Sequence, residues 1–414
     1  MPSEIVFDPY KDLYSKSVGL IRSSEIRDLM SVAGRSDVIS LAGGLPDVTG
    51  VPTSELSSLM TRIIEDGFAE ALQYGDTEGF YNLKTQLVSL MSEENIKAEE
   101  EHVLITTGSQ QALDLLARIF IDPNDIIVVE GPTYVGALTA FRPAGPRFLT
   151  VPLDDEGIRT EILEEELRSL TGARPKFIYV VPNFHNPAGV TMSEERRKHL
   201  VDIATRFEVL IIEDNPYGLL RFEGDSVEPI VNRIPERVVY VGTLSKVIFP
   251  GIRVGWVLAP LPIHEKLVKI KQSADLCSSN LNQMFACAFL ESGLWKKNLD
   301  ELKKRYKARK DSMIEALGQY FPEGSSWTNP SGGLFIWATL EEYLDTAKML
   351  PLAIEQKVAY VPGSAFYPDY SGKNRMRLNF SYPTVEQIQE GVKRLGKVIR
   401  REMDLYRSLG IGKK

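Results

Sequence analysis

Residues 238–256 read Val-Val-Tyr-Val-Gly-Thr-Leu-Ser-Lys-Val-Ile-Phe-Pro-Gly-Ile-Arg-Val-Gly-Trp, and this stretch decides the fold and the site. The β-branched residues at 238–241 predict a buried strand, and the polar turn after it presents Lys246. A lysine just beyond a buried strand loses hydration, so its amine is more easily neutral and nucleophilic. The nearby hydroxyls and Arg253 would suit a phosphate. Together these residues favour a Schiff base with pyridoxal phosphate, although a single lysine in a loop is more often an ordinary solvent-facing residue.

Strand-like and helical segments alternate along most of the chain before this stretch. The segment 102–116 predicts a strand, a glycine turn and a helix. Further apolar strands are expected at 125–130, 148–151, 177–181 and 209–212. Continuous apolar strands that alternate with helices predict an α/β fold whose mostly parallel central sheet is covered by helices on both faces. In such a sheet, ligands bind at the carboxyl ends of the strands.

Polar side chains follow three of the predicted strands. Asn186 follows the strand at 177–181, Asp214 and Tyr217 follow the strand at 209–212, and Lys246 follows the strand at 238–241. One carboxylate at a strand end is often a helix cap or a turn residue. An amide, a carboxylate, a phenol and a lysine at three successive strand ends are difficult to explain by turn chemistry alone. We therefore expect a functional site at this edge of the sheet.

Two other strand ends offer groups for a ligand. Ser109 and Gln110 would open a helix after a glycine turn, where free backbone N–H groups and the helix dipole suit a phosphate. Both residue types also begin helices without binding anything. Tyr134 could present a flat ring face near the end of the strand at 125–130.

Three further candidates come from loops and from the C-terminal part. The glycine pair Gly43-Gly44 suits either a tight turn or a backbone that approaches a ligand closely. Tyr74 lies in a polar, glycine-bounded loop, where an exposed tyrosine often has no function. Arg375 and Arg377 share one face of an alternating strand at 375–381, and an arginine on a strand facing a cleft is a natural fork for a carboxylate.

Composition limits the class of protein. The 414 residues exceed the size of one typical hydrophobic core, so we expect two domains. The net charge of −8 argues against nucleic-acid and acidic-membrane partners. The two cysteines, Cys277 and Cys287, are too few for a disulfide framework and fit a reducing cytoplasm. The four histidines show no metal-ligand spacing, the N-terminus does not look like a signal peptide, and no apolar run is as long as a membrane span. A cytoplasmic enzyme without a metal is the expectation.

Eight runs of residues resemble a known family, the fold-type I, pyridoxal-phosphate-dependent aminotransferases of class I. They are Ser-Leu-Ala-Gly-Gly-Leu-Pro (40–46), Leu-Gln-Tyr (72–74), Thr-Thr-Gly-Ser-Gln-Gln-Ala-Leu-Asp (106–114), Asn-Phe-His-Asn-Pro-Ala-Gly-Val (183–190), Glu-Asp-Asn-Pro-Tyr (213–217), Leu-Ser-Lys (244–246), Pro-Gly-Ile-Arg-Val-Gly (250–255) and Arg-Leu-Asn-Phe (377–380). The resemblance extends over nearly the whole chain and is strongest to the branch of 2-aminoadipate, kynurenine and aromatic aminotransferases. It implies an aspartate-aminotransferase-like fold, with an N-terminal helix and part of the small domain at 1–50, a large cofactor-binding domain at 51–310 and a C-terminal small domain at 311–414.

The resemblance also implies a role for each candidate residue. Lys246 would hold the cofactor covalently, and Asp214 would pair with its pyridine nitrogen. Tyr217 and Asn186 would bind the ring's 3-hydroxyl oxygen, and Tyr134 would stack on the ring. The phosphate would be held by Ser109, Gln110, Thr243, Ser245 and Arg253, with Tyr74 reaching the phosphate of a neighbouring subunit in a two-fold homodimer. The substrate's α-carboxylate would bind Arg377, assisted by Asn186 and the backbone around Gly44.

Substrate choice is left more open by the resemblance. Related enzymes accept acidic and bulky apolar amino acids, with 2-oxoglutarate and glutamate as one pair. Arg27 matches an arginine that meets the distal carboxylate in 2-aminoadipate aminotransferases, but it could equally be a surface charge on a helix. Two other functions fit the same motifs: a β-lyase (C–S lyase) of the same fold, and an amino-acid sensor that borrows the fold. The sensors carry an N-terminal winged-helix domain, and the residues before the cofactor-binding region here are neither basic nor patterned like one.

Overall fold

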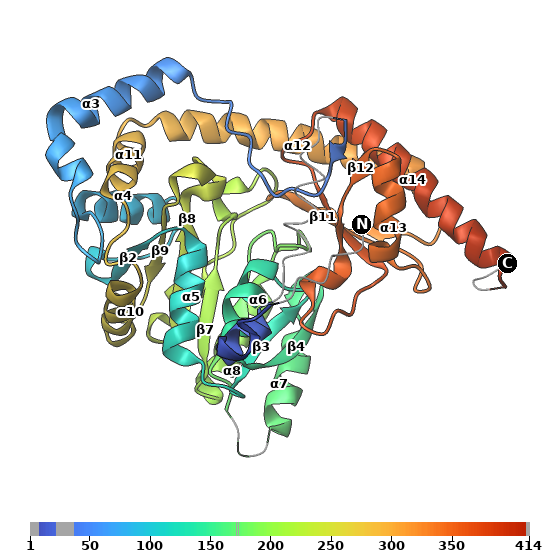
Figure 1. Cartoon of the computed structure of the whole chain (residues 1–414), viewed down its shortest axis with the longest axis horizontal. Coiled ribbons are helices and arrows are strands. Elements are labelled where there is room, and N and C mark those ends of the chain that lie inside the picture. The colour runs from blue at the N-terminus through green and yellow to red at the C-terminus, as the bar shows by residue number, and fades with distance from the viewer. Residues whose placement is uncertain (1–7, 22–36, 171, 173, 411–414) are drawn as a thin grey trace.

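The structure is a computed structural model that describes residues 8–21, 37–170, 172 and 174–410 (Figure 1). Its main element is an eight-stranded sheet with the order β2-β9-β8-β7-β6-β3-β4-β5. The strands are β2 (Val103–Thr106), β3 (Ile126–Gly131), β4 (Arg147–Asp154), β5 (Gly157–Ile158), β6 (Phe177–Val180), β7 (Leu210–Asp214), β8 (Val238–Thr243) and β9 (Gly255–Leu258).

The sheet is mostly parallel, as predicted. Strands β4, β3, β6, β7 and β8 run parallel to one another, whereas β9 is antiparallel to β2 and β8, and β5 is antiparallel to β4. Every residue of β2, β3, β6, β8 and β9 is buried, which means that both faces of the sheet are covered. This double burial is why the strands appear in the sequence as continuous apolar runs.

Strand β9 was not expected as a strand from the sequence. It is four residues long and starts with a glycine, so it lacks the run of β-branched residues that marks the other strands. Gly255 is required there by packing, because a Cβ at this position would lie 2.6 Å from the backbone nitrogen of Ser109. The close approach brings the turn that carries Arg253 against the first residue of the helix that starts at Ser109.

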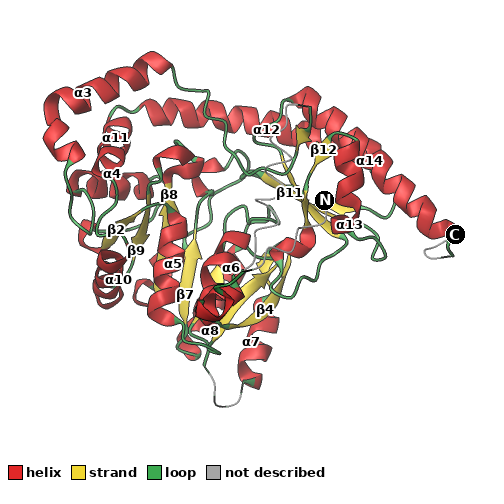
Figure 2. Ribbon diagram, viewed as in Figure 1, coloured by secondary structure: helices red, strands yellow, loops and turns green. Residues whose placement is uncertain are grey.

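Helices surround the strands, as Figure 2 shows. The α-helices in the described part of the chain are α1 (Lys16–Leu20), α3 (Thr53–Leu72), α4 (Tyr81–Ser92), α5 (Ser109–Phe120), α6 (Val135–Phe141), α7 (Thr160–Ser169), α8 (Glu194–Arg206), α9 (Ile230–Arg233), α10 (Leu261–Ala274), α11 (Asn280–Glu291), α12 (Leu294–Tyr320), α13 (Thr346–Glu355) and α14 (Val385–Ser408). The predicted C-terminal amphipathic helix is α14, which starts with a capping box formed by Thr384 and Gln387 and packs along α12.

The C-terminal part contributes a second, smaller sheet. Its order is β10-β11-β14-β13, all antiparallel, with β10 (Ser326–Trp327), β11 (Phe335–Thr339), β13 (Val361–Pro362) and β14 (Arg375–Asn379). A two-stranded parallel pair joins β1 (Ile39–Ser40) to β12 (Val358–Ala359), so residues near both ends of the chain meet. The division into domains stays a prediction, and its expected boundary at residue 310 lies inside the unbroken helix α12.

None of the helices in the described ranges is long and apolar enough to cross a membrane.

Candidate active site

A cavity of about 260 Å³ lies at the carboxyl ends of β6, β7 and β8. It is lined by Ser109, Gln110, Tyr134, Val181, Asn186, Asp214, Pro216, Tyr217, Thr243, Ser245, Lys246, Pro250 and Arg253. Most of the residues singled out in the sequence therefore share one cavity, although they come from segments that are far apart along the chain. The arrangement follows from the parallel sheet, whose strand ends meet at one edge.

Asp214 is the last residue of β7 and is buried. Its Oδ2 accepts a hydrogen bond of 2.7 Å from the hydroxyl of Tyr179, while its buried Oδ1 has no partner. Burial and, to a smaller extent, the charge of Glu130 raise the pKa of Asp214 to about 7, against the lowering effect of the Tyr179 hydrogen bond. A buried acceptor without a donor is costly, so Oδ1 is suited to an N–H group of a ligand in the cavity.

Lys246 ends a 3-10 turn (Leu244–Lys246) that follows β8 directly. Its Nζ donates a hydrogen bond of 2.9 Å to the carbonyl oxygen of Gly44. Burial, together with the positive charges of Arg377 and Arg253, lowers the pKa of Lys246 to about 8. A much larger fraction of this amine than of an ordinary lysine is therefore neutral near neutral pH, as a nucleophile or a general base requires.

A cradle for an anion lies beside Lys246, at the start of α5. Helix α5 follows Gly108, which has a φ of +73° and provides no side chain to cap the free N–H groups. A Cβ at Gly108 would lie 2.3 Å from a terminal nitrogen of Arg253, so only glycine leaves room for the guanidinium. Arg253 donates to Oγ of Ser245 at 3.4 Å, and Thr243 Oγ1 donates to the same oxygen at 3.0 Å. These hydroxyl, guanidinium and backbone donors suit a phosphate.

Arg377 on β14 forms a second anion-binding group next to the cavity. Its two terminal nitrogens donate to Oδ1 of Asn186 at 2.9 Å and to the carbonyl oxygen of Ala42 at 2.8 Å, and its buried Nε has no partner. Asn186 in turn donates to the hydroxyl of Tyr217 at 3.3 Å. Burial lowers the pKa of Arg377 to about 10, so the guanidinium still carries its charge at neutral pH.

Two aromatic rings hold this guanidinium. The ring centres of Phe335 and Phe366 lie 4.2 and 5.0 Å from the central carbon of Arg377. Phe335 also explains why residue 44 is a glycine, because a Cβ at Gly44 would lie 2.9 Å from the ring of Phe335. The backbone of the segment from Ala42 to Gly44 thus reaches both Arg377 and Lys246.

Tyr134 and Gln110 complete the walls. Tyr134 precedes α6, and a Cβ at Gly136 would lie 2.3 Å from its ring. Burial and the charge of Asp214 raise the pKa of Tyr134 to about 12, so the phenol stays protonated. Gln110 lines the cavity, but its side-chain amide donates to the carbonyl oxygen of Gly136 at 2.9 Å, so this group has a structural partner as well.

Two other residues considered in the sequence, Tyr74 and Arg375, do not line the cavity. Tyr74 lies after α3 with 77% of its surface exposed. Arg375 donates instead to the hydroxyl of Tyr367 at 2.6 Å. Arg27 lies outside the described residues. Conversely, no sequence pattern pointed to Tyr179, because a tyrosine in the apolar run Phe-Ile-Tyr-Val is typical of a core residue.

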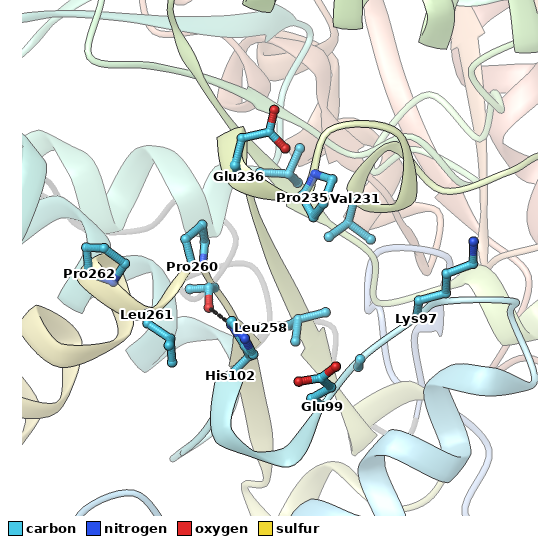
Figure 3. Close-up of a pocket in the computed structure, with 13 residues that line it drawn as sticks. Lys97, Glu99, His102, Val231, Pro235, Glu236, Leu258, Pro260, Leu261 and Pro262 are labelled. Carbon is cyan, nitrogen blue, oxygen red and sulfur yellow. Dashed lines mark hydrogen bonds between the residues drawn. The ribbon is translucent and has the colours of Figure 1, made fainter.

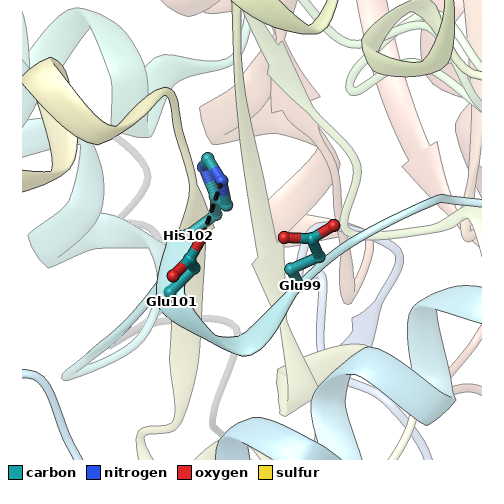
Figure 4. Close-up of side chains that lie close together, drawn as sticks. All are labelled: Glu99, Glu101 and His102. Atoms are coloured by element: carbon teal, nitrogen blue, oxygen red, sulfur yellow. Dashed lines mark ion pairs between the residues drawn. The ribbon is translucent and has the colours of Figure 1, made fainter.

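A larger cavity of about 660 Å³ lies at the opposite edge of the sheet, where β8 begins and β9 ends (Figure 3). Its walls are mainly apolar, with Val231, Pro235, Leu258 and Leu261 among them, and it contains none of the strand-end polar groups. Beside it, Glu99, Glu101 and His102 bring carboxylate and imidazole atoms within 4.8 Å of one another. Figure 4 shows these three side chains. Histidine spacing alone does not reveal this group, because its other two members are glutamates with exposed side chains.

The donors and acceptors of the first cavity fit pyridoxal phosphate. The anion cradle at α5 suits its phosphate, the unpartnered oxygen of Asp214 suits a protonated ring nitrogen, and the amine of Lys246 suits its aldehyde. All three groups face one cavity. A phosphate site alone, or a reactive lysine alone, would not require this combination.

Comparison with known proteins identifies the family. The family "Aminotransferase class I and II" matches residues 36–395. Aromatic-amino-acid aminotransferase 1 of Thermococcus litoralis is 46% identical over 95% of each chain. Among solved structures, Pyrococcus horikoshii kynurenine aminotransferase superposes with a TM-score of 0.91 at 44% identity, over 95% of this chain and 98% of that one. The α-aminoadipate aminotransferase of Thermus thermophilus, complexed with N-(5'-phosphopyridoxyl)-L-leucine, gives 0.89 at 35% identity, over 96% and 99%.

The family match covers most of the chain, and the similar enzymes are matched over nearly their whole lengths. The chain belongs to the class I and II aminotransferase family, and it is a pyridoxal-phosphate-dependent aminotransferase.

Proposed function

We propose that this aminotransferase moves the amino group between an α-amino acid with an acidic or bulky side chain and a 2-oxo acid such as 2-oxoglutarate. The amino donors would be 2-aminoadipate, aromatic amino acids and glutamate. The observation that carries the proposal is the placement of the Arg377 guanidinium, hydrogen-bonded to Asn186, beside the cavity that contains Lys246 and Asp214. The similarity to aromatic, kynurenine and α-aminoadipate aminotransferases supports the substrate class.

Each cavity residue receives a role in this proposal. When bound, pyridoxal phosphate supplies a ring that accepts the electron pair left at the substrate's Cα. Asp214 holds the ring nitrogen in its protonated form. Asn186 and Tyr217 hold the ring's 3-hydroxyl oxygen, and Tyr134 covers one face of the ring. The phosphate is held by Ser109, Gln110, Thr243, Ser245 and Arg253.

Lys246 performs two tasks. It holds the cofactor covalently between turnovers, and it carries the proton that leaves Cα during the reaction. Its pKa of about 8 suits the second task, because the amine can both accept and release a proton near neutral pH. The carbonyl oxygen of Gly44, 2.9 Å from Nζ, keeps the amine oriented toward the cavity.

Arg377 binds the α-carboxylate of the substrate. Its guanidinium is buried, its charge is retained, and the rings of Phe335 and Phe366 limit its movement. A fixed, desolvated guanidinium binds a carboxylate in a defined orientation. The α-carboxylate would thereby set the position of Cα relative to Lys246.

We also propose a homodimer with shared active sites. Ile64, Phe68 and Leu72 lie on α3 on the two sides of a kink at Gly67, and 44%, 59% and 66% of their respective surfaces are exposed. Such exposed apolar side chains are typical of a surface covered by a partner, and Tyr74 follows them directly. A second copy of the chain would cover these side chains and receive Tyr74 at its phosphate cradle. Both cysteines are free thiols, which supports a cytoplasmic location.

The test is an absorbance titration of the purified, cofactor-loaded enzyme. The visible cofactor band should bleach on adding glutamate and return on adding 2-oxoadipate, because each oxo acid reverses the half-reaction of its amino acid. Return only with aromatic oxo acids would restrict the substrate class to aromatic amino acids. Production of pyruvate and ammonia from cysteine conjugates, without recovery of the band by any oxo acid, would instead indicate the β-lyase.

A further inference from the structure

Glu130 is a buried carboxylate that no step assigned above uses. It lies near the end of β3 with 1% of its surface exposed. Burying a carboxylate costs several kcal/mol unless its oxygens find donors. Packing alone therefore does not explain a buried carboxylate at the carboxyl ends of the strands, where the cofactor cavity lies.

The partners of Glu130 come from the segment that carries Asn186. Oε2 accepts a hydrogen bond of 2.9 Å from the backbone N–H of Val181, and the same oxygen lies 3.0 Å from Nε2 of His185. The side chain of His185 is also only 1% exposed. Glu130 thus contacts this segment at its start and next to Asn186.

The hydrogen bonds of His185 indicate which ring nitrogen carries the proton. Its Nδ1 accepts a hydrogen bond of 3.2 Å from the backbone N–H of Ala188, so Nδ1 presents a lone pair and carries no proton. In a neutral imidazole the proton is then on Nε2, which faces Glu130. The charge that this arrangement brings to the sheet is the negative charge of the Glu130 carboxylate.

This charge acts on Asp214. Two groups affect the carboxyl of Asp214 besides burial: the hydroxyl of Tyr179 on β6 and the charge of Glu130 on β3. Three cations lie on the other elements that face the cavity: Lys246, Arg253 and Arg377. The two arginines lower the pKa of the lysine. None of the three cations is among the groups that act on Asp214. The polar groups on this side of the cavity therefore favour an additional positive charge.

We propose that Glu130 is a positioning residue with two effects: its negative charge favours the protonated state of the cofactor's ring nitrogen at Asp214, and its carboxylate holds the turn that carries Asn186. The inference rests on the proposed role of Asp214. Two anions, Asp214 and Glu130, would then stabilise the proton on the ring nitrogen.

Two substitutions separate charge from geometry. Glu130→Gln removes the charge, while its amide oxygen can still accept from Val181 and face His185. Glu130→Asp keeps the charge but is one methylene shorter, so it loses these contacts. Glu213→Gln is the matched control, because Glu213 is equally buried at this sheet edge, accepts backbone hydrogen bonds from Ile230 and Val231, and does not act on Asp214.

The readout is the nitrogen chemical shift of the enzyme loaded with pyridoxal phosphate that carries ¹⁵N in the ring, followed from pH 6 to pH 9. We expect a protonated ring nitrogen throughout in the wild type and in Glu213→Gln. In Glu130→Gln its apparent pKa should fall by about 1 or more, whereas Glu130→Asp should keep the wild-type shift and show a raised KM for the amino acid.

A Glu130→Gln enzyme that folds, as checked by its melting temperature, and keeps the wild-type nitrogen shift would overturn the proposal. A shift that moves in Glu130→Asp but not in Glu130→Gln would also overturn it, because geometry and not charge would then be responsible. An unprotonated ring nitrogen in the wild type would instead contradict the role of Asp214, which is a failure of the proposed function rather than of Glu130.

Discussion

Replacing Lys246 with methionine should stabilise the cofactor-free protein while abolishing its function. Methionine has nearly the volume of lysine without its charge. The structure lowers the pKa of Lys246 from an ordinary value of 10.5 to about 8, mainly through burial and then through Arg377 and Arg253. This difference of about 2.5 pKa units corresponds to about 3.5 kcal/mol, at roughly 1.4 kcal/mol for each pKa unit. The hydrogen bond to Gly44 is worth about 1 kcal/mol and is lost in the variant, so the expected net gain is about 2.5 kcal/mol at pH 7.

The pH dependence gives this prediction its sign. The unfolded chain keeps the lysine proton up to about pH 10.5, whereas the folded chain releases it near pH 8. Between these values the unfolded state binds more protons than the folded state. The free energy of unfolding of the wild type therefore increases as the pH rises from 8 to 10.5. The advantage of Lys246→Met should therefore be constant below pH 8 and disappear by about pH 10.5.

The assay is urea unfolding of cofactor-free wild type and variant, at one protein concentration, at pH 7 and at pH 10.5. Lys271→Met is the matched control, because Lys271 is buried but pairs with Asp275 at 2.8 Å, and its loss should destabilise the protein. A Lys246→Met variant that is less stable than wild type at pH 7, with a difference that does not change with pH, would refute the reasoning.

Three further substitutions test separate parts of the site. Arg377→Lys keeps the charge but loses the paired contacts with Asn186 and Ala42, so kcat/KM for the amino acid should fall by about 10- to 100-fold with an unchanged cofactor spectrum; an unchanged kcat/KM in steady-state assays would contradict the α-carboxylate role. Tyr74→Phe removes one hydroxyl and should raise the cofactor Kd by about tenfold without changing the sedimentation of the proposed dimer, and equal cofactor retention would remove Tyr74 from the phosphate site. Arg27→Ala should raise the KM for 2-aminoadipate more than for aromatic amino acids, and equal effects on both would show that Arg27 does not meet the distal carboxylate.

Sequence patterns were sufficient for the parallel strands of the main sheet and for most of the cavity wall. Strands β3, β6 and β8 are buried on both faces, so each one is visible as an apolar run that ends in polar residues. Because these ends meet at one edge of the sheet, Asn186, Asp214 and Lys246 could be grouped without coordinates.

Other features depend on contacts that leave little trace in the sequence. Strand β9 is short and begins with a glycine that is fixed by packing against the start of α5. Tyr179 is indistinguishable from a core aromatic until its hydroxyl is seen 2.7 Å from Asp214. Glu130 resembles the polar end of a strand, and only the fold places it 3.0 Å from His185. The carbonyl of Ala42 belongs to the backbone, so no residue type could have predicted its contact with Arg377.

The central claim is that Lys246 is the residue that holds the cofactor covalently. The most direct measurement is to reduce the purified, cofactor-loaded enzyme with sodium borohydride, digest it and map the modified lysine by mass spectrometry. We predict one phosphopyridoxyl group for each chain, on the peptide that contains Lys246, and none on that peptide in a Lys246→Ala variant. Attachment to a different lysine, or no attachment in an enzyme that transaminates, would contradict the account.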